Sequence, residues 1–140
     1  MTTQLSPEQL AVVEDEGKKG RAAWKNGDLP TAEQHFLAAW NALPEPSLEQ
    51  EYAQILSRGI TTFYRDTKQF EKAKKWIETT RQAYGPGDPS VEFLAGTVAF
   101  ESGDLDEAYR LFHPLYLKYA DRPFEGHTKY LDFTRNRSHE

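Results

Sequence analysis

Apolar residues recur every three or four positions along most of this chain, which is the spacing of an amphipathic helix. The pattern begins after Ser6, where Pro7 at the first helical position and Gln9 three residues after the cap form a helix-start signal. It runs to Gly27, which can end a helix, and a second helical stretch follows up to Pro44. No stretch alternates strictly between apolar and polar residues, as a half-buried strand would. We therefore expect an all-α chain.

Four further helical stretches follow, and they form two pairs that are each joined by a short turn. The pattern predicts helices over residues 47–66, 69–84, 90–101 and 104–118. The segment GPGDP at residues 85–89 separates the two pairs as a strong helix stop. Pro114 lies inside the last stretch and should kink or shorten that helix, because proline lacks the amide hydrogen of the helical bond. The chain is thus predicted to form three helical hairpins.

Two segments of the sequence look like copies of one unit. GDLPTAEQHF from Gly27 and GDLDEAYRLF from Gly103 share Gly, Asp, Leu, Ala and Phe in the same register, 76 positions apart (103 − 27). Repeated helix pairs at a period near 34 residues are typical of helical solenoids, and on this pattern the chain resembles the tetratricopeptide repeat (TPR) family. That family favours small residues where its two helices touch and an aromatic residue one turn further on. The residues at such places here are Gly20, Ala32, Phe36 and Ala39 in the first unit, Ile60, Tyr64 and Ala73 in the second, and Gly96, Ala108 and Phe112 in the third.

The resemblance implies three TPR-like antiparallel helical hairpins in a short right-handed superhelix with a C-terminal capping segment. We expect one TPR-like domain over residues 1–140, with repeats over about 7–46, 47–87 and 88–122. About seven extra residues near 47–53 should lengthen the third helix, and the tryptophan of the family pattern is missing. Residues 123–140 should cap the last hairpin and end in a frayed RNRSHE segment. The alternative is that this tail binds the partner.

Composition and charge narrow the classes of function. The chain has 140 residues, of which 38% are hydrophobic and 28% charged, as expected for one soluble domain. It has no cysteine, no apolar run of about 20 residues and no signal-peptide pattern, so we expect a cytoplasmic protein with no membrane contact. A net charge of −5 opposes nucleic-acid binding and is compatible with a protein partner.

Residue types that carry chemistry occur, but their spacing does not form a known site. No two of the four histidines have metal-ligand spacing, and no phosphate-binding loop or nucleophile elbow is present. We therefore expect no catalytic residue, no metal and no cofactor.

Partner-binding residues follow from the resemblance, because TPR arrays bind ligands on the first helix of each pair. The residues that we expect on this concave face are Arg21, Trp24, Lys25, Arg58, Thr62, Arg65, Phe93, Thr97 and Phe100. Arginine forks and flat aromatic rings are typical hot spots of protein interfaces. The alternative is that the aromatic residues pack between helices and that the arginines pair with nearby carboxylates.

We expect a non-enzymatic protein–protein interaction module, monomeric or weakly self-associating. By analogy with small free-standing bacterial TPR proteins, an immunity protein that neutralises a cognate toxin is preferred. A secretion-type chaperone or adaptor is the alternative, and a self-associating structural TPR protein is a third class. The clamp by which some TPR domains hold the carboxyl terminus of chaperones is missing. Only one of the five residues at the clamp positions is basic, namely Arg21. The others are Gly17, Gly59, Ser90 and Leu94.

Overall fold

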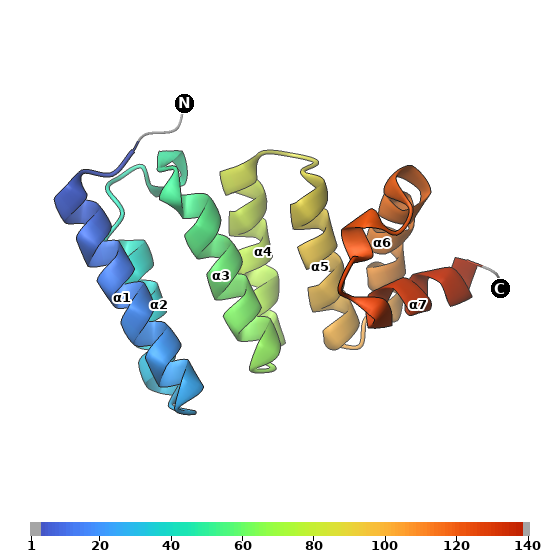
Figure 1. The fold of residues 1–140 in the computed structure, drawn as a ribbon, viewed down its shortest axis with the longest axis horizontal. Coiled ribbons are helices and arrows are strands. Elements are labelled where there is room, and N and C mark those ends of the chain that lie inside the picture. Colours follow the sequence, from blue (N-terminus) through green and yellow to red (C-terminus); the bar gives the residue numbers. More distant parts are fainter. Residues whose placement is uncertain (1–3, 139–140) are drawn as a thin grey trace.

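Helices form all the regular structure in residues 4–138, the part of the chain that the computed structural model describes. The helices are α1 (Pro7–Lys25), α2 (Leu29–Asn41), α3 (Tyr52–Asp66), α4 (Phe70–Tyr84), α5 (Pro89–Glu101), α6 (Leu105–Tyr119) and α7 (Thr128–Ser138), with 3-10 turns η1 (Ser47–Glu49) and η2 (Arg122–Phe124). They follow one another along the long axis of the molecule, from α1 at one end to α6 and α7 at the other (Figure 1). The all-α prediction is confirmed.

The two GDL segments are helix starts. Gly27 and Gly103 have φ values of 80° and 89°, a left-handed conformation that glycine adopts without strain and that turns the chain at the ends of α1 and α5. Asp28 then accepts a hydrogen bond from the backbone N–H of Thr31 at 3.3 Å, and Asp104 accepts one in the same way at the start of α6. These carboxylates cap α2 and α6, so the repeated sequence encodes a repeated turn.

Consecutive helices pack most extensively as the pairs α1–α2, α3–α4 and α5–α6. Glycine permits the close approach in the first and third pairs, because a Cβ atom at Gly20 would lie 2.7 Å from the ring of Phe36, and one at Gly96 would lie 2.4 Å from the ring of Phe112. Each ring therefore lies directly on the backbone of the partner helix. Phe36 also contacts Phe63 of the next pair at 5.1 Å between ring centroids, so it joins neighbouring pairs as well.

Two expectations about helix length are wrong. The extra residues near 47–53 form η1 and an extended Gln50 (φ −78°, ψ 135°), so α3 begins only at Tyr52 instead of being lengthened. The side chain of Gln50 donates to the carbonyl of Pro44 at 3.1 Å and holds this connection. Pro114 does not shorten α6, which continues to Tyr119, and of the two expected effects only the kink stays a prediction. Its ring is on the solvent side, while the adjacent Leu115 is buried and holds the helix against the core.

The C-terminal segment packs on the third pair. Phe124 and Tyr130 are buried, and they pack together with Phe93 and Phe112. The segment 135–138 is helical and not frayed, because Ser138 at the end of α7 lies 3.1 Å from the hydroxyl of Tyr109. Residues 139–140 of the expected frayed end, and residues 1–3 of the expected domain, lie outside the described part of the chain.

Candidate interaction groove

A groove separates α1 from α3 on the face of the molecule that these helices share. Both helices pack on α2, and the rings of Trp24 on α1 and Phe63 on α3 are 5.1 Å apart. The groove has a volume of about 820 Å³, which is within the range of about 300–1,000 Å³ that is usual for ligand sites. Buried side chains of Val13, Phe36 and Ile60 form its apolar floor.

The groove continues toward the amino-terminal ends of both helices. A second hollow of about 350 Å³ shares Glu14, Tyr52 and Ile55 with it and extends to Leu5 and Leu10. At the junction, Ile55 is 61% exposed, which makes it one of the most exposed large apolar side chains of the described residues. We call the two hollows together the α1–α3 groove.

Three cations line this groove without a carboxylate partner. Among residues 4–138, no Asp or Glu oxygen lies within ion-pair distance of Lys18, Arg21 or Arg58. Arg58 makes one long hydrogen bond of 3.4 Å to the Ser90 hydroxyl. Its charge also helps to hold the pKa of Asp88 below the usual value, although the hydrogen bond from Ser90 is the larger cause. Unpaired guanidinium groups beside apolar surface are suited to binding a partner's carboxylates.

Four of the nine expected partner-binding residues meet in the α1–α3 groove. Arg21 and Trp24 come from α1, and Arg58 and Thr62 come from α3. Trp24 is partly buried and also packs on Phe36 and Phe63, so it belongs to both the core and the groove wall. The core-packing interpretation is therefore confirmed for this residue, and its partner-binding role stays a prediction.

The other five expected residues lie elsewhere. Lys25 is exposed at the end of α1, outside the groove lining. Arg65 donates to Thr97 at 2.9 Å and to Asp66 at 2.8 Å, so it joins α3 to α5, and Thr97 is only 1% exposed. Phe93 is buried, and Phe100 packs on α7.

The C-terminal helix explains why the third pair offers no such surface. The Phe100 ring lies 5.3 Å from the Tyr130 ring of α7, and the Tyr130 hydroxyl donates to Glu101 at 2.7 Å. Burial of the phenol and this hydrogen bond raise the pKa of Tyr130. In the third pair, α7 therefore covers the helix face on which a partner was expected.

The sequence prediction missed Lys18 and Gly59, which also line the groove. A signal for Lys18 was available, because Glu14, Lys18 and Arg21 follow the helical i, i+4, i+7 spacing and so share one face of α1. Gly59 stands at one of the clamp places that the family resemblance names, but it has no side chain that would indicate binding there. It lies in the middle of α3, and a Cβ atom built on it meets no atom within 4 Å.

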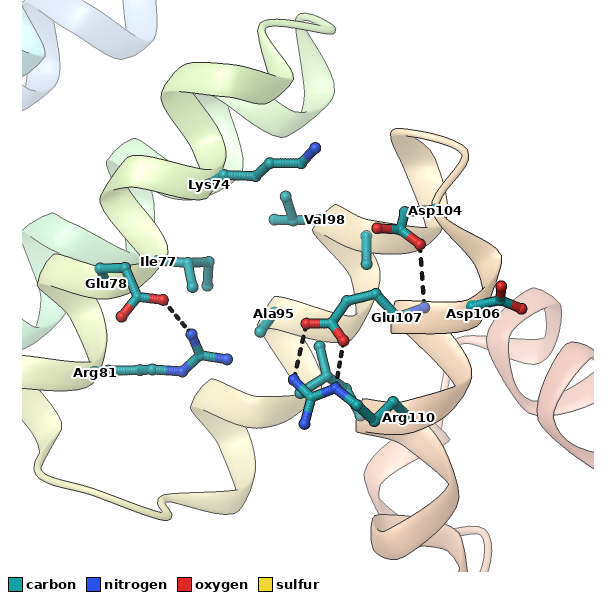
Figure 2. A pocket seen from close by; sticks show the side chains of 12 residues that line it. Lys74, Ile77, Glu78, Arg81, Ala95, Val98, Asp104, Asp106, Glu107 and Arg110 are labelled. Atoms are coloured by element: carbon teal, nitrogen blue, oxygen red, sulfur yellow. Dashed lines mark hydrogen bonds and ion pairs between the residues drawn. The ribbon is translucent and has the colours of Figure 1, made fainter.

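A separate hollow of about 540 Å³ lies between α4, α5 and α6, and Figure 2 shows the charged side chains around it. These charges are paired, either with one another or with neighbouring residues outside the lining. Arg81 donates to Glu92 at 3.0 and 3.1 Å and pairs with Glu78, and Arg110 donates to Glu107 at 2.8 Å. The hydrogen bonds to Glu92 raise the pKa of Arg81, and burial partly opposes them. This hollow is therefore a structural joint between the second and third pairs.

Neither a metal site nor a membrane-spanning helix is apparent in the part of the chain that is described. No group of three His, Cys, Asp or Glu residues there could hold a metal ion. None of the helices described is both long and apolar enough to cross a bilayer. The side chains of His35 and Glu16 lie 2.7 Å apart and join α1 to α2. The α1–α3 groove is thus the candidate site that these contacts leave open.

Comparisons of the chain with protein-family models, with curated proteins and with solved structures give no match, so the function is argued from the geometry of the groove.

Proposed function

We propose that this chain is a non-enzymatic protein-binding module and that the α1–α3 groove holds a segment of its partner. The observation that carries the proposal is the combination of three cations that form no ion pair with exposed apolar surface in one groove, whose main hollow has a volume of about 820 Å³. The scaffold is a short right-handed array of three TPR-like hairpins. The tight Gly20–Phe36 and Gly96–Phe112 contacts and the pairwise packing of consecutive helices support that assignment.

The groove has the anatomy of an interface, with an apolar centre and a charged rim. Burying an isoleucine side chain contributes about 1.5–3 kcal/mol. Most of this gain is available to a partner at Ile55, which is 61% exposed. Arg21 and Arg58 are positioned to pair with carboxylates as water leaves the groove, and pairing there is stronger than on an open surface.

An immunity protein that occludes a toxin would use such a groove, as would a secretion-type chaperone that shields an exported segment. We favour the immunity role by family analogy, and we propose a monomer in which α7 covers the end of the array. Sedimentation at increasing protein concentration tests whether the protein is a monomer. If it were instead a self-associating structural protein, its sedimentation coefficient would rise with concentration.

Filling the groove tests the proposal. Since a Cβ atom at Gly59 meets no atom within 4 Å, Gly59→Trp should place its ring in the groove without disturbing the fold. The matched control is Leu117→Trp on α6, where the native side chain is already 71% exposed. In affinity capture from the native organism, the wild type and the control should recover the same partner, and Gly59→Trp should lose it. Equal recovery by both variants, with unchanged circular dichroism, would refute the proposal.

A further inference from the structure

From the charge distribution along the α1–α3 groove, we infer that its occupant is a short amphipathic helix of the partner, with acidic residues at one end and basic residues at the other. This inference rests on the proposed function and specifies the partner chemistry at the same site.

The two walls of the groove run in the same direction. Early residues of α1 line it together with the start of α3, as Leu10 does with Tyr52, and near the other end of α1 the rings of Trp24 and Phe63 lie 5.1 Å apart. From Leu10 to Trp24 the groove follows α1 over fourteen residue-to-residue steps (24 − 10), or about 21 Å at 1.5 Å per step. A helix of about fourteen residues matches this length.

Charge is distributed unevenly along these walls. Glu14 and Glu51 line the hollow at the amino-terminal ends of the two helices. Lys18, Arg21 and Arg58 line the groove further along. Two carboxylates also line this part: Asp15 pairs with Lys19 at 3.0 Å on the same helix, and Glu14 lies one helical turn before Lys18, at the boundary between the two hollows. The groove therefore has an acidic end and a basic end.

A helix suits this groove better than an extended segment does. An extended backbone brings N–H and C=O groups that need partners, whereas the floor of Val13, Phe36 and Ile60 offers none. The hydroxyl of Thr62 already donates to the Arg58 carbonyl at 3.0 Å. A helix satisfies its own backbone, and the missing side chain at Gly59 leaves room for its close approach.

The charged ends also set the direction of the occupant. Helices favour acidic residues in the first turn and basic residues in the last turn. An occupant antiparallel to α1 and α3 therefore brings its acidic first turn to Arg21 and Arg58, and its basic last turn to Glu14 and Glu51. The helix dipole of the occupant opposes this direction, because its positive amino-terminal end would face the two arginines. The dipole amounts to only about half a charge at each end. The whole charges of the side chains outweigh it.

The test uses a displayed library of fourteen-residue helical peptides with one apolar face, in which first-turn and last-turn positions are either acidic or basic. Selection on the wild-type protein should enrich peptides with an acidic first turn and a basic last turn. A synthetic peptide of that kind should bind Arg21→Glu/Arg58→Glu at least about tenfold more weakly than the wild type. The control Lys75→Glu/Lys118→Glu makes the same charge change at exposed positions of α4 and α6 and should keep the affinity.

Each other outcome overturns the inference: no enrichment, enrichment without this charge order, or equal binding to both double variants. The proposed function is judged separately by partner capture. If Gly59→Trp loses the captured partner while the library shows no charge order, the groove binds the partner but the occupant is not this kind of helix. If Gly59→Trp keeps the partner, the groove itself is not the partner site.

Discussion

A glycine-to-alanine comparison tests the packing that positions the helices. At an exposed position inside a helix, replacing glycine by alanine stabilises by about 1 kcal/mol, because alanine restricts the unfolded chain and favours the helix. Gly59 in α3 and Gly96 in α5 both lie inside helices, but only Gly96 faces another side chain. The same substitution should therefore have opposite effects at the two positions.

The magnitude at Gly96 follows from the contacts. A Cβ atom there would lie 2.4, 2.7 and 2.9 Å from three atoms of the Phe112 ring. That ring is fully buried and cannot move away, because Phe93, Phe124 and Tyr130 surround it. Overpacking of this kind costs about 1–3 kcal/mol. Since the helix-propensity gain is common to both variants, Gly59→Ala should be more stable than Gly96→Ala by about 1–3 kcal/mol.

Urea unfolding followed by circular dichroism measures this difference. We expect the urea midpoint of Gly59→Ala to lie above that of the wild type and the midpoint of Gly96→Ala to lie below that of Gly59→Ala. The denaturant slopes of the two variants should be equal. Adding Phe112→Leu should remove the clash, so that the double variant is more stable than the sum of the two single changes allows. Equal stabilisation by both glycine substitutions would refute the close Gly96–Phe112 contact.

Three further predictions concern single side chains. Pro114→Ala should raise the free energy of unfolding by about 2 kcal/mol in urea titrations, because α6 continues through this position and alanine restores the missing hydrogen bond; a loss would contradict that geometry. Arg81→Met should lower the free energy of unfolding by about 1 kcal/mol, because Glu92 loses two hydrogen bonds. An unchanged urea midpoint would show that the Arg81–Glu92 pair contributes nothing to stability. The hydrogen bond from Lys72 lowers the pKa of Glu33 below its ordinary value of 4.5. This pair therefore stabilises the fold at pH values above 4.5, and the stabilisation is lost as the pH falls through the lowered pKa. Glu33→Gln should accordingly lower the melting temperature at pH 7 and much less at pH 3, and an equal shift at both would contradict the ion pair.

The helices could be predicted from the sequence because their signals are local. Ser6 and Gln9 form a reciprocal cap within four residues, with hydrogen bonds of 2.9 and 3.2 Å. Asp28 and Asp104 act over three residues in the same way. Gly20 was expected at a close helix contact because of its spacing, and it lies against the Phe36 ring.

The surface of the third pair could not be predicted, because it depends on contacts between distant segments. Phe93 and Phe100 have the helical spacing of a binding face, but the Tyr130 ring that packs on both comes from a helix some 30 residues later. The α1–α3 groove is likewise a product of how two helices sit on α2. Local patterns indicated Arg21 and Arg58 separately but gave no measure of the space between them.

Hydrogen exchange of backbone amides in the complex with the captured partner tests the central claim most directly. The account predicts that binding slows exchange along α1 and α3, around Arg21, Ile55 and Gly59, and leaves the joint between α4 and α6 around Arg81 unchanged. Protection confined to that joint or to α7, with α1 and α3 unaffected, would contradict it.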